Sequence, residues 1–228
     1  MMPFNLTVFF TAMLIIKLYR KLTPRQIGRY GFTLCTVALL WLAWVVRNDW
    51  GAPVVMIGLI LFGIGQGALV TLLFNVLVTA SPKELAGDVG SLRGTTNNLA
   101  AGVGTAVSGA LLVGLLSAFI LASLAQHPEL KTELRSQINL DNNINFISND
   151  RLQTALERTS IPAAKIEEAV RINEEARLRA LKIGLLVMAA LSLLAIFPAG
   201  RLPNYKPGEI PANPPPPAPK YKAEPEGA

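Results

Sequence analysis

The sequence has few charged residues and almost no reactive side chains. Only 16% of its 228 residues are Asp, Glu, Lys or Arg, against about 25% in soluble globular domains. It contains one cysteine, Cys35, and one histidine, His127. One cysteine excludes an internal disulfide, and these two residues supply neither a metal-ligand cluster nor a nucleophile beside a base. We therefore expect no metal, no cofactor and no enzymatic activity.

The missing charge leaves long uncharged runs. A helix needs roughly 20 apolar residues to cross a ~30 Å hydrocarbon core. Five runs are candidates for such helices: Phe4–Ile16, Gly31–Val46, Val54–Ala80, Thr95–Ala125 and Gly184–Gly200. The first run is short, as though the beginning of a helix were missing. The pattern predicts an all-α fold, a polytopic membrane helix bundle of about five transmembrane helices.

The loops predict the orientation of this bundle. Residues 17–29 contain Lys and Arg but no acid, which is typical of a short cytoplasmic loop. Alternation of the spans then places the N-terminus outside and the C-terminus in the cytoplasm, for a multi-pass protein of the cell (inner or plasma) membrane. The formal net charge of +6 is assigned to such membrane boundaries. Because the basic residues form no aromatic–basic face, we expect no nucleic-acid partner.

The chain divides into four segments. Residues 1–125 contain the first four transmembrane helices, and residues 126–177 form an extracytoplasmic helical loop. Residues 178–201 form the last transmembrane helix, and residues 202–228 are a disordered Pro-rich cytoplasmic tail. The tail includes Pro214–Pro217, and such a composition favours extended, disordered chain over a packed core.

Two helices are expected in the outer segment. Ser148 or Asn149 is expected to cap a short helix, and Ser160 a second helix that starts at Pro162, since proline is favoured in the first turn. No helix breaker stands between Pro162 and Phe197. The second helix is therefore expected to continue into the last span.

Small residues are concentrated in two of the uncharged runs. Glycine lets the backbones of two membrane helices approach closely, so we expect packing faces at Gly63 and Gly67 and, in the next run, at Gly102, Gly109 and Gly114. The second face suits tight packing or sliding between two packed arrangements, and the sequence leaves both open. It predicts that Gly109→Leu disrupts helix packing. A nucleotide-binding role for the first glycines is rejected, because no βαβ pattern surrounds them.

Uncharged polar residues within the runs are candidates for substrate binding, because polar groups are costly in a membrane. They are Gln66 and Asn75 in one run, and Asn97 and Asn98 at the start of the next. Gln66 and Asn75 lie nine residues apart and point to opposite faces of a straight helix. Bridging to a neighbouring helix is the alternative role of the two later asparagines. No Asp or Glu lies in any run, so a proton-coupling carboxylate is expected outside this chain.

Several of these features together resemble the C-terminal part of a major facilitator superfamily transporter, closest to the fourteen-span drug:proton antiporter type. The resemblance rests on Gly63–Gly67, Ser81-Pro82, Ala86-Gly87 and the small-residue helix Gly102–Gly114. It implies that the chain holds the last five helices of fourteen.

The basic loop adds to this resemblance. Its end, with Arg25, Gly28 and Arg29, resembles the superfamily's cytoplasmic loop between the second and third helices of a half. The Asp that usually begins this motif is absent here.

The resemblance implies a proton-coupled exporter of drugs or other small molecules, built on a partial major facilitator fold. The implied partners are the lipid bilayer, a small-molecule substrate with the proton as coupling ion, and the missing N-terminal half of the transporter. A non-transporting membrane scaffold or remnant that binds partner chains is the alternative. A pore-forming oligomer ranks last, because the runs lack the charged or carbonyl-rich lining of a selective channel.

Overall fold

The structure is a computed structural model that describes residues 2–18, 21–47, 52–79, 86–126, 149–157 and 162–204. All the regular elements in these ranges are α-helices, in agreement with the predicted all-α class. They are α1 (Met2–Leu18), α2 (Pro24–Val45), α3 (Pro53–Thr79), α4 (Ala86–Gln126), α6 (Asn149–Glu157) and α7 (Ala163–Ala199).

Four of these helices, α2, α3, α4 and α7, are long and apolar enough to cross a membrane. Helix α1 is also apolar but has only 17 residues, or about 25 Å at 1.5 Å per residue. It falls short of the ~30 Å hydrocarbon core. The predicted partial membrane bundle is therefore confirmed as a fold class, with four full-length candidate spans and one shorter apolar helix.

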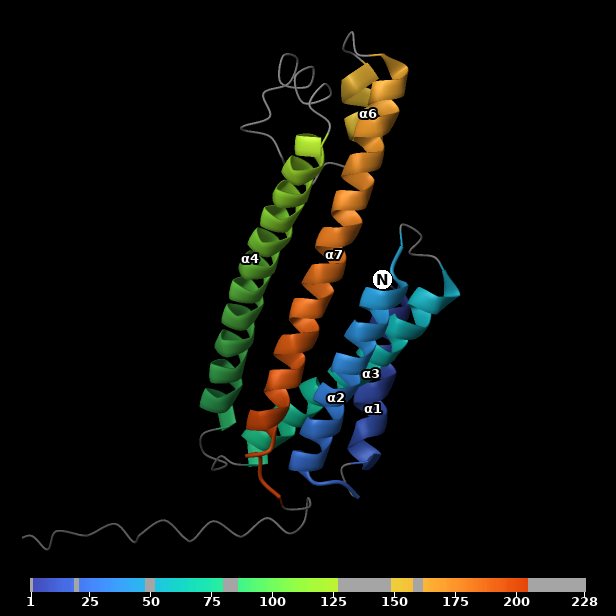
Figure 1. Cartoon of the computed structure of the whole chain (residues 1–228). Coiled ribbons are helices and arrows are strands. Elements are labelled where there is room, and N and C mark those ends of the chain that lie inside the picture. Colours follow the sequence, from blue (N-terminus) through green and yellow to red (C-terminus); the bar gives the residue numbers. More distant parts are fainter. Residues whose placement is uncertain are drawn as a thin grey trace, which may run out of the picture.

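The helices form a packed group with one outlying member (Figure 1). Helix α3 contacts both α1 and α2, and α2 packs on its other side against α7. A core of apolar side chains fills the space among α1, α2 and α3, with members from each: Ile15, Ile27, Cys35, Ala68, Leu69 and Leu72. Helix α4 stands beside α7 and makes only a small contact with α3.

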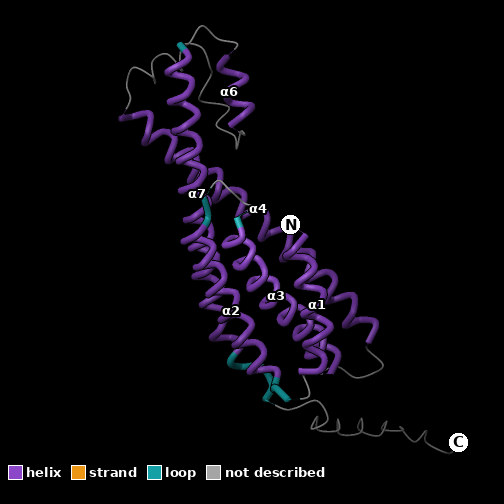
Figure 2. The backbone as a smooth tube through the Cα atoms, turned by 90° about the vertical axis from the view of Figure 1, so that its right-hand side faces the viewer, coloured by secondary structure: helices purple, strands orange, loops and turns teal. Residues whose placement is uncertain are grey.

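Helix α7 runs without interruption for 37 residues, so the helix expected after Ser160 is continuous with the apolar run Gly184–Gly200. At about 55 Å, it is longer than a bilayer is thick. Its N-terminal part packs on α6, away from α1, α2 and α3 (Figure 2). The contact is apolar around the fully buried Leu156. Beside it, Asn173 Nδ2 donates a hydrogen bond to Asn149 Oδ1 at 2.8 Å.

The helix starts differ from the predicted ones at two places. The expected cap at Ser160 is wrong: the N-cap residue of α7 is Pro162, and no side chain caps the helix. Helix α4 begins at Ala86 rather than near Thr95, because Asp88 lies in its first turn, where an acid interacts favourably with the helix dipole. His127, half of the segment 126–177 and the Pro-rich tail from residue 205 lie outside the described residues.

Candidate functional site

Five helix ends meet at one end of the bundle. Helices α1, α3 and α7 end there, and α2 and α4 begin there (Figure 1). Four basic residues mark this end of the molecule, which we call the basic end: Lys21, Arg25, Arg29 and Arg201.

A capping box sets the start of α2 at the basic end. Thr23 Oγ1 accepts a hydrogen bond from the backbone N–H of Gln26, and Gln26 Oε1 accepts one from the backbone N–H of Thr23. Pro24 occupies the first helical turn, where its missing N–H costs nothing. The prediction that Arg25 and Arg29 belong to a loop is therefore wrong. The cap places them in the first turns of α2.

These first turns of α2 hold the C-terminal end of α7. The backbone N–H of Arg25 donates to the carbonyl of Pro203 at 3.3 Å, and Arg25 Nε donates to the carbonyl of Leu202 at 3.2 Å. The end of a helix leaves carbonyls without intrahelical partners, and a cation is favoured there. Arg25 thus fixes the point at which the chain leaves α7.

Gly28 and Gly200 allow the start of α2 and the end of α7 to approach each other closely. A Cβ on Gly28 would lie 2.8 Å from Leu202 Cδ1 and 3.4 Å from the Cβ of Ala199. A Cβ on Gly200 would lie 2.8 Å from Nη2 of Arg29. Arg25, Gly28 and Arg29, which the sequence placed together as a loop motif, therefore act together as a helix-packing site.

The glycines of α3 pack against two neighbours. Gly63 and Gly67 face α1: a Cβ on Gly67 would lie 2.8 Å from the carbonyl oxygen of Val8, and one on Gly63 would lie 3.1 Å from that of Phe4. Gly65 faces α2, where a Cβ would lie 2.5 Å from Sγ of Cys35. Helix α3 is thus wedged between α1 and α2 with backbones in close approach.

The glycines of α4 have no such neighbours. A Cβ added to Gly102, Gly109 or Gly114 would meet no described atom within 4 Å. Helix α4 touches α7 only through its later part, where Leu116 is fully buried against Ala176 and Ala180. The small-residue face predicted on α4 therefore has no partner among the described residues.

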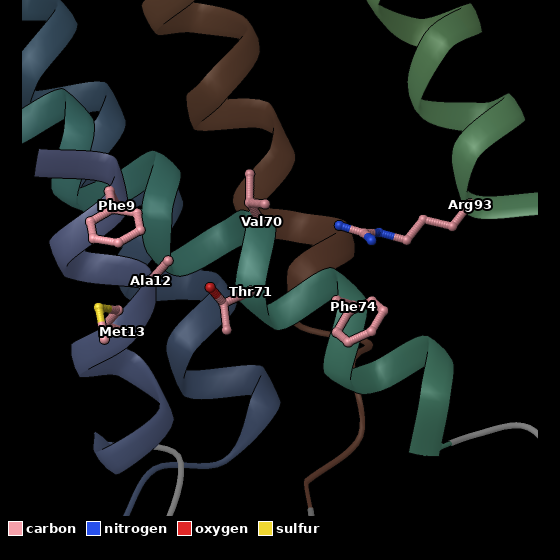
Figure 3. Close-up of a pocket in the computed structure, with 7 residues that line it drawn as sticks. All are labelled: Phe9, Ala12, Met13, Val70, Thr71, Phe74 and Arg93. Atoms are coloured by element: carbon pink, nitrogen blue, oxygen red, sulfur yellow. The ribbon is translucent and has the colours of Figure 1, made fainter. Parts of the chain in front are cut away.

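An apolar groove lies between α1, α3 and the start of α4, and it is the candidate functional site (Figure 3). Its volume is about 320 Å³, at the lower end of the range for small-molecule sites. Three lining residues come from α1, three from α3 and one from α4: Phe9, Ala12, Met13, Val70, Thr71, Phe74 and Arg93.

Arg93 is the one charged residue in the lining of this groove. Its guanidinium carbon lies over the ring of Phe74, 4.6 Å from the centroid, which is a cation–π geometry. Figure 3 shows the Arg93 side chain reaching from α4 toward α3. This contact closes one side of the groove.

Thr71 adds little polarity to the wall of the groove. Its hydroxyl donates a hydrogen bond to the carbonyl of Gly67, one turn earlier in α3, at 2.9 Å. Phe9 and Met13 of α1 keep 60% of their surface exposed, so the groove is open along α1. It offers an apolar wall with a cation at one side.

The four predicted substrate-binding residues are not among those that line the groove. Gln66 precedes Val70 by four residues, and Asn97 follows Arg93 by four. Each therefore lies one helical turn from a lining residue and on the same side of its helix, further from the basic end. Asn75 follows the lining residue Thr71 by four residues, so it also lies one helical turn from the groove, nearer the basic end. Asn98 is exposed on α4.

The sequence reasoning missed the residues that form the groove. Phe9, Phe74 and their apolar neighbours look like ordinary lipid-facing side chains, and only tertiary contacts bring α1, α3 and α4 together. Arg93 carried a usable signal. It is the eighth residue of a long helix whose other charged residue is Asp88, but it precedes the uncharged run Thr95–Ala125 and was therefore not a candidate.

Residues 1–105 match the family model of the Major Facilitator Superfamily. The matched part contains α1, α2, α3 and the first half of α4, which includes every residue of the groove. This part of the chain is therefore similar to members of the Major Facilitator Superfamily. Together with the four long apolar helices, this similarity indicates a multi-pass membrane protein. No curated protein and no solved structure matches the chain.

Proposed function

We propose that the chain is the C-terminal segment of a proton-coupled exporter of the fourteen-span drug:proton antiporter type, which moves small amphipathic molecules. The groove between α1, α3 and α4 is the observation that carries this proposal. Its wall is apolar with one cation, as an amphipathic molecule requires. In this proposal, Gln66 and Asn97 extend the groove by one turn and supply hydrogen-bonding groups to a substrate.

The proposed partner is the N-terminal half of the transporter, either upstream in the same chain or as a separate chain. Alternating access requires two halves that rock around a central site. The uncovered face of α4, with Gly102, Gly109 and Gly114, supports this proposal because a small-residue face suits close packing with another helix. Packing of that face on the other half would also enclose the groove.

Proton coupling is proposed to depend on a carboxylate in that other half. The residues that line the groove include no Asp or Glu. An ionisable group that alternates between the two sides of the membrane is what a proton-driven pump requires. We propose the inner or plasma membrane as the location, with the basic end and the tail in the cytoplasm and the α6–α7 part outside, because positive charge gathers at the basic end.

A membrane scaffold that binds partner chains without transport is the second candidate. It is favoured by the same uncovered face of α4, since a surface that packs on another protein need not take part in transport. The two candidates differ in what the groove does. Filling the groove stops transport in the first and changes nothing in the second.

Export from cells tests the proposal. The chain is expressed with its upstream helices, and efflux is followed for a cationic, a neutral and an anionic fluorescent amphipath: ethidium, Nile red and anilinonaphthalene sulfonate. We expect Val70→Trp, which fills the groove, to abolish efflux of the exported compound. Leu194→Trp, on an exposed part of α7, is the matched control and keeps efflux. Equal efflux from both variants, or none above cells without the protein, would favour the scaffold.

A further inference from the structure

We propose that the groove selects organic anions with an apolar body, and that Arg93 binds the anionic group. The biological meaning of this inference rests on the proposed transport role, but the binding itself does not.

Arg93 lies within a helix that is long and apolar enough to cross a membrane. It stands near the start of that helix, and a cation without an acidic partner beside an apolar groove is a candidate for binding an anion. Within the part of the chain that the structure describes, its partner is the ring of Phe74, and no ion pair of Arg93 is formed. A cation–π contact uses none of the N–H donors of the guanidinium in a hydrogen bond to a carboxylate, so these donors can bind an anion.

The described lining of the groove carries positive charge and no negative charge. None of its lining residues is acidic. The Arg93 charge therefore faces an apolar surface of low dielectric, where its attraction for an anion is stronger than in water. A cationic amphipath would be repelled at the same place. The positive charge of Arg93 therefore favours an anionic ligand over a cationic one.

The rest of the groove fits the apolar part of such a ligand. Phe9, Met13 and Val70 form an apolar wall, and the hydroxyl of Thr71 is engaged by the carbonyl of Gly67. A volume of about 320 Å³ suits a molecule with one short chain or a small ring system. It is too small to enclose a phospholipid with two acyl chains. We therefore assign the groove to a freely diffusing single-chain anion.

Equilibrium binding to the full chain in phosphatidylcholine nanodiscs tests the assignment. Three labelled probes share one decyl chain and differ only in charge: decanesulfonate, decyltrimethylammonium and decanol. The sulfonate is ionised at every pH used. After subtraction of binding to empty nanodiscs, we expect saturable binding of decanesulfonate at least about tenfold tighter than that of the cation. The reason is that one charge-assisted contact is gained with the anion and lost with the cation.

Substitutions separate the charge of Arg93 from the shape of the groove. Arg93→Gln is expected to weaken decanesulfonate binding roughly 10- to 100-fold and to leave decanol unchanged. Arg93→Lys is expected to retain part of the affinity. Val70→Trp keeps the charge but fills the groove, and is expected to abolish binding of both ligands. Arg47→Gln, which removes an exposed cation at the other end of α2, is the matched control and has no effect.

Three results would overturn the proposal: equal binding of the sulfonate and the ammonium probe, no effect of Arg93→Gln, or full binding in Val70→Trp. Loss of sulfonate binding when phosphatidylglycerol is added to the nanodiscs would assign the site to a lipid headgroup instead and would also overturn it. The binding assay involves no transport. Arg93-dependent binding without efflux from cells would contradict the transport function alone, whereas efflux with a preference for cations would contradict the anion site alone.

Discussion

Helices α3 and α4 share a composition and differ in their surroundings. Both are long, apolar and rich in glycine. In the most apolar stretch of α3, 39% of the residues are buried, whereas in that of α4 only 6% are. The glycines of α3 lie against the backbones of α1 and α2, and those of α4 contact nothing that the structure describes.

The difference shows what a small-residue face means in a membrane helix. Between apolar helices in lipid there is little hydrophobic driving force, so close backbone packing provides much of the stability. Helix α3 has its packing partners within this chain, and its glycines stabilise the fold. Helix α4 has the same kind of face without a partner among the described residues, and we propose that its glycines pack against another helix. The following substitutions test this contrast in order of expected effect.

Gly65→Leu is expected to have the largest effect. Even a Cβ at this position would lie 2.5 Å from Cys35 Sγ and 3.0 Å from the carbonyl oxygen of Gly31. Because part of this contact is backbone, the helices must separate, and we expect a loss of about 1–3 kcal/mol in the free energy of unfolding. Unfolding by SDS in mixed micelles measures it. Gly104→Leu in α4, where a Cβ meets nothing within 4 Å, is the matched control, and equal stability of the two variants would contradict the contrast.

Arg25→Gln is expected to have an intermediate effect. It removes the hydrogen bond from Arg25 Nε to the carbonyl of Leu202 and leaves the backbone bond to Pro203 in place. We expect a loss of about 1 kcal/mol in the free energy of unfolding, as for one part-buried hydrogen bond. The same SDS titration measures it, with Arg47→Gln as the control for lost charge. A variant as stable as that control would show that α2 does not hold the end of α7 through this side chain.

Gly109→Leu is expected to have the smallest effect on the chain by itself. The sequence alone predicts disruption at this position, but a side chain at Gly109 points into open space. We therefore expect a change of less than about 0.5 kcal/mol in the free energy of unfolding of the purified chain. In the proposed assembly with an N-terminal half, we expect the same substitution to stop efflux. A large loss of stability in the purified chain would reveal a packing partner within it and contradict the contrast.

The long uncharged runs predicted the helices well, because hydropathy and the absence of breakers are local properties. They identified the cores of α2, α3 and α4 and the continuation of α7 through the membrane. Helix starts were less predictable. The capping box of Thr23 and Gln26 extends α2 into the basic segment, and Asp88 extends α4 by about two turns. Both signals are short and polar, so the uncharged runs do not include them and the helix starts were predicted too late in the sequence.

The candidate site was less predictable than the helices. The groove depends on which faces of α1, α3 and α4 meet, and that is decided by the glycines that hold α3 against α1. The polar residues Gln66 and Asn97 were sensible choices, and they lie one turn from the groove. The lining itself is apolar apart from Arg93 and Thr71, so it looked no different from a lipid-facing surface. The contact between Arg25 and the end of α7 could be found only from the tertiary structure, because the two segments are far apart in the sequence.

Photo-crosslinking in intact membranes tests most directly whether α4 presents an assembly face. A benzophenone amino acid is placed at Gly109 on α4 or, as the control, at the exposed Leu194 on α7. We expect a crosslink from position 109 to a helix of the proposed N-terminal half, identified by mass spectrometry, and only lipid adducts from position 194. Lipid adducts alone from both positions would contradict it.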